Sequence, residues 1–385
     1  MTPATETFPE IPLFDLRLEP EDLDAVAETL RSGWLTMGPR TCALETAFAE
    51  HLGARHAVAV SSCTAALHLA YLGAGVGPGD EVIVPSLTFA ATANAVLYCG
   101  ATPVFAEIFG QHDLSLDPDD VEARITERTK AVVVVHFAGY AAPVDRLAAL
   151  CEAHGLALIE DVAHAPSATC AGRKLGTFGR AGCFSFFSNK ILSVGEGGLL
   201  ATDDDAMAEQ ARLRRSHGMT SGTWARHLGQ TDTYDVAALG FNYRLDEPRS
   251  ALALSRLRRL EADIDRRREL VRRYRSRLCA HDGLAVPFRD EDVATSSCYV
   301  MPILLADPAR QPELRRFLLA ERGVQTSLFY PAVHTFSAYR ERFGEISLPR
   351  TELAARTEVT IPLYSHMTEE EQDHVIDAIE EGLAR

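Results

Sequence analysis

The chain has 385 residues, of which 46% are apolar and 24% charged, a composition typical of a soluble globular protein with about two or three domains. Its formal net charge of −16 argues against a nucleic-acid-binding surface, which requires clustered Lys and Arg. The N-terminal sequence lacks the basic start and apolar run of a signal peptide, and no apolar stretch approaches the ~20 residues that span a membrane, so we expect a cytoplasmic protein.

Short apolar runs alternate with helical patterns over the first two-thirds of the chain. Runs rich in Val, Ile and Leu at 56–60, 80–85, 130–137 and 156–161 are continuous rather than alternating, which is typical of strands buried on both faces. With helices between them, they predict a parallel α/β sheet. The glycine-rich segment 73–79 follows a helix and precedes a strand, the reverse of a dinucleotide-binding fingerprint, and is interpreted as a turn.

The pattern changes from about Leu245. Apolar residues recur at helical spacing through an Arg-rich segment that ends near residues 281–283, namely Leu257, Leu260, Ile264, Val271, Tyr274 and Leu278. This spacing predicts a long helix that leaves the sheet domain and enters a smaller α+β domain. We therefore divide the chain into a large α/β domain with an N-terminal arm, residues 1–250, and a small C-terminal domain, residues 251–385.

Lys190 is conspicuous because lysine is rare in this chain. Of the 38 Lys and Arg residues, only Lys130, Lys174 and Lys190 are lysines. It follows the apolar, aromatic run CFSFFSN and precedes the glycine-rich SVGEGG. A lysine amine, unlike a guanidinium group, can lose its proton and attack a carbonyl carbon. This stretch alone leaves open a chance surface lysine beside a turn.

Other polar groups follow the predicted strands, where open α/β sheets place their ligands. The turn SSCT, residues 61–64, begins a predicted helix and is either an ordinary N-cap or an anion cradle. Asp161 ends a buried strand and needs a cationic partner, either a salt bridge or a bound ring nitrogen. His164 either faces the same pocket or is hydrogen-bonded locally.

Two further candidates complete this set. Ser185, five residues before Lys190, is a candidate second phosphate ligand, and Phe89 is either a core residue or a flat face for a ring. An amine, a carboxylate, two hydroxyl-bearing sites and an aromatic face are together what pyridoxal phosphate (PLP) requires. The eight cysteines form no CxxC pair and show no metal-ligand spacing, so we expect reduced thiols and no metal site.

The chain resembles the DegT/DnrJ/EryC1/StrS family of PLP-dependent sugar aminotransferases over nearly its whole length. The motifs that carry the resemblance are SGWLTMGPRTCALETAFAEHLGARHAVAVSSCTAALHLA, GDEVIVPSLTFAATANAVLYCGATPVF, LIEDVAHA, FSFFSNKILSVGEGGLL, LGFNYRLDE and IPLYSHMTEEE. The resemblance implies the aspartate aminotransferase-like fold (fold type I) and a homodimer with active sites at the subunit interface.

The position of each candidate in these motifs implies a role. Lys190 corresponds to the Schiff-base lysine and Asp161 to the partner of the pyridine nitrogen. The remaining cofactor-binding residues are implied to be His164 beside the ring, Phe89 stacked on it, the Cys63 backbone with Thr64 and Ser185 at the phosphate, and Asn242 reaching the partner subunit's phosphate. Many family members have Gly at the position of Cys63, so its thiol could crowd the phosphate.

The resemblance also implies a two-stage amino transfer through pyridoxamine phosphate (PMP), with L-glutamate as donor. The segment SHGMTSGTWARH (216–227) favours a nucleotide-linked 4-keto-6-deoxyhexose as acceptor, in the biosynthesis of amino sugars of natural products. Arg226, Arg244 and Lys174 are candidates for contacting its diphosphate.

Three alternatives use the same scaffold. An aminocyclitol aminotransferase would act on a keto-inositol type of ring with the same residues. A dehydratase of this family would carry His at the lysine position, which Lys190 argues against. A non-catalytic PLP-binding regulatory protein would tolerate loss of Lys190 or Asp161, and both are present.

Overall fold

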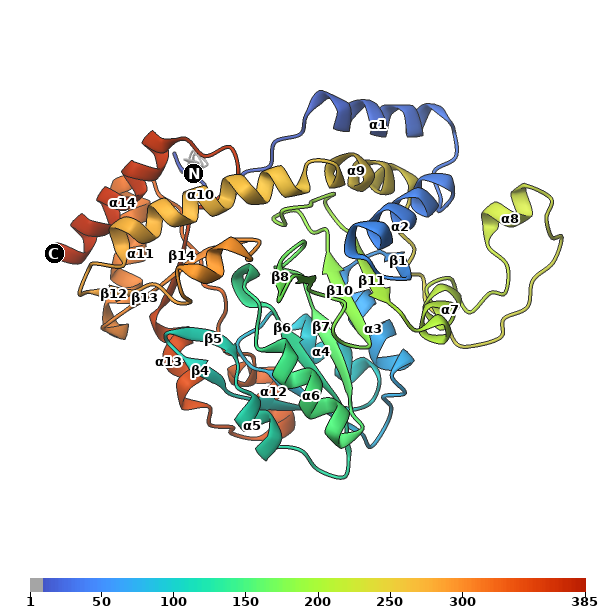
Figure 1. Ribbon diagram of the computed structural model, residues 1–385, viewed down its shortest axis with the longest axis horizontal. Helices are drawn as coiled ribbons and strands as arrows, with labels where there is room; N and C mark the ends of the chain where they lie inside the picture. The colour runs from blue at the N-terminus through green and yellow to red at the C-terminus, as the bar shows by residue number, and fades with distance from the viewer. Residues whose placement is uncertain (1–9) are drawn as a thin grey trace, which may run out of the picture.

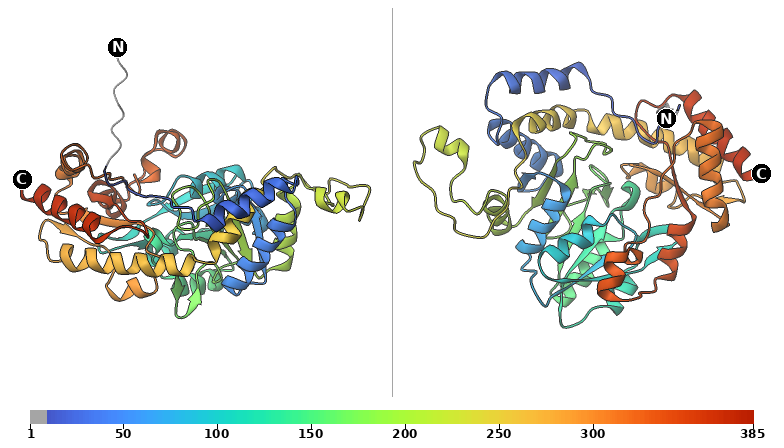
Figure 2. Two further views of the ribbon diagram at one scale, coloured as in Figure 1. Left: turned by 90° about the horizontal axis from the view of Figure 1, so that it is seen from above. Right: turned by 180° about the vertical axis from the view of Figure 1, so that it is seen from behind.

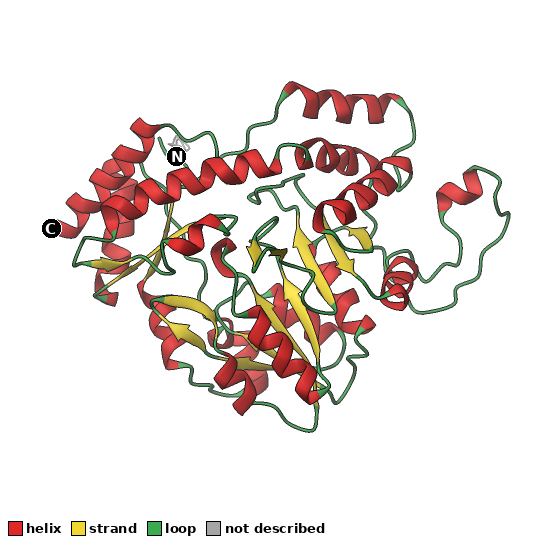
Figure 3. Cartoon of the chain, in the orientation of Figure 1, coloured by secondary structure: helices red, strands yellow, loops and turns green. Residues whose placement is uncertain are grey.

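A seven-stranded sheet forms the centre of the computed structural model, which describes residues 10–385 (Figures 1 and 3). Its spatial order is β1-β11-β10-β7-β6-β2-β3, and only β11 runs antiparallel to its neighbours. The predicted α/β class with a mostly parallel sheet is therefore confirmed. The strands are β1 (His56–Val60), β2 (Glu81–Pro85), β3 (Thr102–Ala106), β6 (Thr129–Val135), β7 (Ala157–Asp161), β10 (Ala181–Ser185) and β11 (Gly198–Thr202).

Both faces of this sheet are buried. Along β1, Ala57 and Ala59 enter one apolar core while Val58 and Val60 enter the other. Because successive side chains of a strand point to opposite faces, a strand covered on both sides needs apolar residues at every position. The helices of this part are α2 (Pro39–Leu52), α3 (Cys63–Gly73), α4 (Ala91–Tyr98), α5 (Pro118–Ala123), α6 (Val144–His154) and α7 (Asp205–Arg214).

A second, three-stranded antiparallel sheet lies in the C-terminal part of the chain. It consists of β12 (Leu284–Ala285), β13 (Met301–Leu305) and β14 (Glu358–Ile361). The helices that accompany it include α11 (Gln311–Arg322), α13 (Pro349–Thr357) and α14 (Glu369–Ala384). The two sheets fall on opposite sides of residue 250, but the division into two domains at that residue stays a prediction.

The predicted long helix is two helices, α9 (Glu247–Leu257) and α10 (Leu260–Leu278), with a break at Arg258 and Arg259. The guanidinium of Arg259 binds the buried carboxylate of Asp22 on α1 (Pro20–Arg31), which packs along α9. This pairing depends on a distant part of the chain, so the local periodicity of residues 257–278 did not reveal the break. Helix α10 then runs from the central sheet to the C-terminal part (Figure 1).

Two segments join distant parts of the molecule. The chain between α7 and α9 projects as an arm that carries α8 (Thr223–His227) (Figures 1 and 2). On this arm, the rings of Trp224 and His227 lie 4.7 and 4.4 Å from Trp34, centroid to centroid. In the C-terminal part, α12 (Ser337–Phe343) packs on the central part, and Tyr339 donates a hydrogen bond of 2.6 Å to Asn94.

Within residues 10–385, no helix combines the length and apolar character needed to cross a membrane.

Glu358, the first residue of β14, is a buried carboxyl group that binds the Phe329 amide at 2.8 Å and the Thr360 hydroxyl. Burial raises the pKa of Glu358 to about 8. The ordinary value for Glu is about 4.3. Between these pH values the folded protein keeps a proton that the unfolded chain releases, so the free energy of unfolding falls as the pH rises.

We expect Glu358→Gln, which keeps an acceptor for the Phe329 amide, to raise the melting temperature by a few degrees at pH 8 and to leave it nearly unchanged near pH 4.5. Melting curves across this pH range test the expectation. Glu341→Gln replaces an exposed glutamate on α12 and serves as the control. A Glu358→Gln effect that is equal at both pH values would contradict it.

Candidate active site

The sequence candidates gather at one edge of the central sheet, where the parallel strands have their carboxyl ends. Asp161 and Ser185 are the last residues of β7 and β10, and the turn 61–64 follows β1. Phe89 lies four residues after β2. Strands of the same direction end at the same edge, which is why residues spread over some 120 positions converge there.

Asp161 is buried and holds a defined set of hydrogen bonds. The Thr92 hydroxyl on α4 donates to Oδ2 at 2.9 Å, and the Ala163 amide donates to Oδ1 at 3.1 Å. The Cys63 thiol lies 3.9 Å from Oδ1. Burial raises the pKa of Asp161, although these hydrogen bonds and the charge of Lys190 act in the opposite direction. A cation beside this carboxylate would offset the cost of burying its charge.

Lys190 lies in the loop between β10 and β11, and its amine is directed inward. Its Nζ atom lies 4.1 Å from the ring centroid of Tyr299. Burial lowers the pKa of Lys190 to about 7, and the opposing attraction of Asp161 does not restore it. A substantial fraction of an amine with this pKa is unprotonated at neutral pH, and this form can act as a nucleophile or base.

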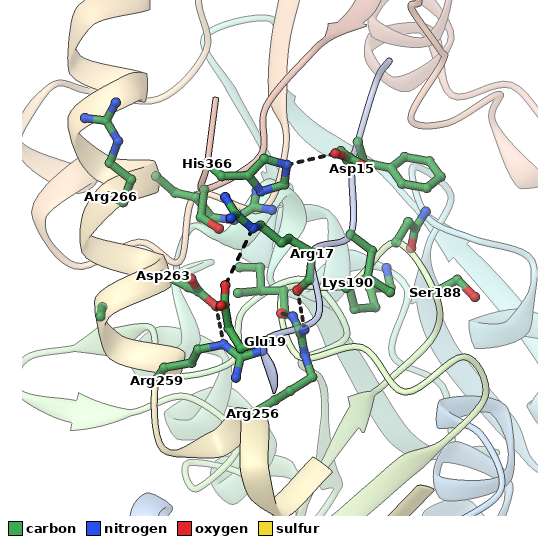
Figure 4. Close-up of a pocket in the computed structure, with 17 residues that line it drawn as sticks. Asp15, Arg17, Glu19, Ser188, Lys190, Arg256, Arg259, Asp263, Arg266 and His366 are labelled. Carbon is green, nitrogen blue, oxygen red and sulfur yellow. Dashed lines mark hydrogen bonds and ion pairs between the residues drawn. The ribbon is translucent and has the colours of Figure 1, made fainter. Parts of the chain in front are cut away.

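The loop that carries Lys190 is fixed from outside by Arg256 of the helix α9. Arg256, which is buried, donates to the carbonyls of Ile191 and Arg17 at 3.0 and 3.2 Å. These residues border a cavity of about 240 Å³ between the loop, α10 and the N-terminal segment 14–19 (Figure 4). The guanidinium of Arg256 therefore restrains the residue next to Lys190.

His164 lies beside this pair in an aromatic surrounding. Its Nε2 atom is 2.9 Å from the Tyr330 hydroxyl, and its ring centroid is 4.4 Å from that of Tyr299. Burial lowers the pKa of His164 well below its ordinary value, and the charge of Lys190 lowers it further, so the ring is neutral. Its buried Nδ1 atom has no hydrogen-bond partner among residues 10–385, which leaves a polar atom for a ligand.

The turn 61–64 forms the N-terminus of α3, an 11-residue helix. The Ser62 hydroxyl accepts the Ala65 amide at 3.1 Å, so the expected N-cap is present. In the described part of the chain, the amides of Cys63 and Thr64 have no acceptor and remain available for an anion. The Cys63 thiol is directed toward Asp161, and burial keeps it neutral by raising its pKa.

Strand β11 brings Ser185 to this turn. Gly198 is paired with both Ser185 and Val60. A Cβ atom on Gly198 would lie 2.4 Å from the Ser62 carbonyl carbon and 2.5 Å from the Cys63 amide nitrogen. Only glycine permits this close approach, which sets the Ser185 side of the sheet against the N-terminus of α3.

Phe89 and Asn242 are both exposed. The Phe89 side chain is 61% exposed, and its ring centroid lies 5.9 Å from that of Tyr330. It is therefore not the core residue of the alternative interpretation. Asn242 lies near the end of the arm, and the carbonyl of its neighbour Tyr243 accepts the Ser61 amide at 2.8 Å, so Asn242 is anchored next to the turn 61–64. Whether Asn242 reaches a partner subunit stays a prediction.

The three candidates for a diphosphate contact differ in their surroundings. Lys174 lies on the hairpin of β8 (Thr169–Cys170) and β9 (Arg173–Lys174) and binds Glu261 at 2.6 Å. It contacts none of the site residues described above. Arg226 donates to the Ser221 carbonyl at 2.6 Å within the arm, and Arg244 donates to the Ser216 hydroxyl at 3.3 Å.

Sequence reasoning missed Thr92, Tyr299 and Tyr330. Thr92 lies only three residues from Phe89, as the second residue of α4, so its presence near the site was open to inference. Tyr299 and Tyr330 come from the C-terminal part, more than 100 residues after Lys190. Both stand in apolar segments, SSCYVMPILL and SLFYPAV, that carry no local signal of a site.

The chain matches the model of the DegT/DnrJ/EryC1/StrS aminotransferase family over residues 17–380. It is 39% identical to the spore coat polysaccharide biosynthesis protein SpsC of Bacillus subtilis over 366 residues, 93% of each chain. It is also similar to the solved structure of the aminotransferase TlmJ from Streptoalloteichus hindustanus, with a TM-score of 0.89 and 38% identity over 97% of this chain and 99% of TlmJ.

A third similar protein is Spr1654 of Streptococcus pneumoniae, which has been solved in a PLP form and a PMP form. The TM-scores are 0.90 and 0.91, at 26% identity, over 97% of this chain and 98% and 99% of the two Spr1654 chains. The residues of the present site fit this cofactor, because within the described chain they offer a buried amine with a lowered pKa, a buried carboxyl group, free amides at a helix N-terminus and the unpartnered Nδ1 of His164. The chain belongs to the DegT/DnrJ/EryC1/StrS family and is a PLP-dependent aminotransferase with the aspartate aminotransferase-like fold.

Proposed function

We propose that the protein is a sugar aminotransferase of amino-sugar biosynthesis, which moves an amino group from L-glutamate to a nucleotide-linked 4-keto-6-deoxyhexose. The observation that carries the transfer chemistry is the buried amine of Lys190, which lies close enough to the buried carboxyl group of Asp161 for the charge of each to shift the pKa of the other. A sugar acceptor is supported by the similarity to SpsC, a protein of polysaccharide biosynthesis. The 4-keto preference rests on the segment 216–227.

Lys190 has the properties of the general base in this proposal. PLP, when bound, supplies an electron sink that lowers the cost of removing a proton from a substrate carbon. The Nζ atom of Lys190 would accept that proton and hold it until it is released again. Because the pKa of Lys190 is about 7, the amine is able both to accept and to release a proton near neutral pH.

Asp161 serves as the partner of the pyridine nitrogen. Its Oδ1 and Oδ2 atoms are oriented by the Ala163 amide and the Thr92 hydroxyl, so the carboxylate does not have to reorganise when a cation binds. His164, neutral and unpartnered at Nδ1, offers a polar contact to the ring from the side. Phe89 supplies an exposed aromatic face that suits stacking.

The phosphate is held by the amides of Cys63 and Thr64 and the hydroxyls of Thr64 and Ser185. The partial positive charge at the N-terminus of α3 favours an anion there. In a homodimer, Asn242 would add a contact to the partner subunit's phosphate. The exposed position of Asn242 beside the anchored Tyr243 is consistent with such a reach.

The acceptor's diphosphate needs local cations in a chain of net charge −16. Arg226 and Arg244 are the candidates that stay in this proposal, because both lie on or next to the arm between α7 and α9. Lys174 does not, since its amine is bound to Glu261. A β-bridge between Ser216 and Asn242 joins the two ends of the arm, and the carbonyl of Tyr243 accepts the Ser61 amide, so the base of the arm is coupled to the phosphate turn.

The close contact between β11 and the phosphate turn is open to a direct test. We expect Gly198→Ala to lower the affinity of the cofactor-free protein for PLP by about tenfold or more, because the added Cβ must displace Ser62 and Cys63, at a cost of roughly 1–3 kcal/mol. Absorbance titration with PLP measures the affinity. Gly197→Ala is the matched control, since its Cβ would meet only side-chain atoms, at 3.1–3.3 Å.

A fall in affinity in both variants, or in neither, would contradict this arrangement. Circular dichroism spectra of the two variants show whether the secondary structure is retained.

The reaction is tested in its two halves. We expect the PLP-loaded protein to be yellow and to lose this colour on addition of L-glutamate, with release of 2-oxoglutarate, and we expect Lys190→Ala to show neither change. The PMP form is then offered nucleotide-linked 4-keto- and 3-keto-6-deoxyhexoses and a keto-inositol. Return of the yellow colour and a mass gain of the acceptor identify the substrate.

Turnover of the 4-keto sugar at least about tenfold faster than the others supports the proposal. Faster turnover of the keto-inositol would instead establish an aminocyclitol aminotransferase. A protein that binds PLP and glutamate but never releases 2-oxoglutarate would be a binding protein.

A further inference from the structure

The ring of Tyr299 forms one wall of the site, directly against the reactive amine. The Nζ atom of Lys190 lies 4.1 Å from the ring centroid, over the face of the ring. The same ring lies 4.4 Å from that of His164, tilted by 32°. Tyr299 is only 4% exposed, so the ring is a fixed part of the interior and contacts two of the site residues at once.

The backbone of Tyr299 is fixed on both sides. Its amide donates to the Ala138 carbonyl at 2.9 Å. The buried guanidinium of Arg267 on α10 donates to the carbonyls of Tyr299 and Leu363 at 3.1 and 3.2 Å. Arg267 therefore ties Tyr299 to the long helix, and the ring has little freedom to move away from Lys190.

Few groups compete with the ring for the amine. The titratable groups that face Lys190 are Asp161 on β7, Cys63 at the start of α3 and His164 after β7, together with Tyr299 itself. Cys63 and His164 are neutral, because burial raises the pKa of the first and lowers that of the second. Asp161 is the one carboxylate in this set. In the proposed function it pairs with the pyridine nitrogen of the cofactor.

The face of an aromatic ring carries negative electrostatic potential and attracts an ammonium group, most strongly where water is excluded. We propose that Tyr299 is a positioning residue for Lys190, whose ring face holds the free amine at the reaction site and favours its protonated form. The inference rests on the proposed role of Lys190 as general base. It adds a determinant of that role which lies outside the sequence motifs around the lysine.

The proposal makes the basicity of Lys190 depend on the electrons of the Tyr299 ring rather than on its hydroxyl. We expect Tyr299→Phe to leave the pKa of Lys190 unchanged and Tyr299→Leu to lower it by about one pH unit, the shift that corresponds to a cation–π contact in a dry site. The opposite sign is expected if the ring merely excludes water, because a smaller side chain would then hydrate the ammonium and raise the pKa.

The chain has only three lysines, so each can be followed separately. The full-length protein freed of cofactor is labelled with trace acetic anhydride over a pH series, and the acetylated fraction of each lysine is measured by mass spectrometry. Lys130 and Lys174 are internal controls, and their unchanged titration shows that a variant remains folded. An unchanged or raised pKa of Lys190 in Tyr299→Leu would overturn the proposal.

A second variant preserves the shape of the site. Pentafluorophenylalanine at position 299 keeps the ring but reverses the potential on its face, so we expect it to lower the pKa of Lys190 relative to Tyr299→Phe. An equal pKa in the two proteins would also overturn the proposal. Since the labelling uses neither cofactor nor sugar, its outcome is independent of which acceptor the enzyme takes. The pH dependence of the half-reaction with glutamate then shows whether the change in the pKa of Lys190 also alters the reaction rate.

Discussion

The site depends on a buried amine, Lys190, and a buried carboxyl group, Asp161, that lie near each other without forming a direct salt bridge. Burial lowers the pKa of Lys190 to about 7 against the opposing attraction of Asp161, and burial likewise raises the pKa of Asp161. No hydrogen bond joins the two groups within the described residues, and each has other neighbours, Tyr299 for the amine and Thr92 with Ala163 for the carboxylate. A tight salt bridge would have kept the amine protonated and the carboxylate occupied. Their separation leaves the first free to react with a carbonyl and the second free to bind a cation.

The rest of the fold maintains this separation. The parallel strands β7 and β10 place Asp161 and Ser185 at one edge of the sheet. Strand β11 lies in close contact with the turn 61–64 at Gly198. The helices α9 and α10 act from the other side, because Arg256 restrains the lysine loop and Arg267 restrains Tyr299. Two buried arginines, Arg256 on α9 and Arg267 on α10, thus restrain the lysine loop and Tyr299, the two sides of the amine contact. Both guanidinium groups donate their hydrogen bonds to backbone carbonyls, and Arg256 also lies 4.0 Å from the carboxylate of Asp22.

Much of this arrangement could be predicted from the sequence. A strand covered on both faces must be apolar throughout, so the runs at 56–60 and 156–161 predicted both the strands and the position of Asp161 at the end of one. The motifs around Lys190 implied its role directly. Tyr299 and Tyr330 could not be predicted, because they reach the site only through the packing of the C-terminal part. The break at Arg259 was missed for a related reason, since it depends on the pairing with Asp22 across the fold. Local pattern therefore indicated the elements of the central sheet, and long-range contacts determined which side chains surround the amine.

The most direct test of the central claim is to identify the amine that bonds to PLP. The protein is loaded with PLP, treated with borohydride to make the bond permanent, digested, and examined by mass spectrometry. Because the chain contains only Lys130, Lys174 and Lys190, the modified peptide is unambiguous. We expect the pyridoxyl group on Lys190 and on neither of the others. Modification of Lys130 or Lys174, or none at all in a protein that retains PLP, would contradict the assignment of Lys190 as the carbonyl-reactive amine.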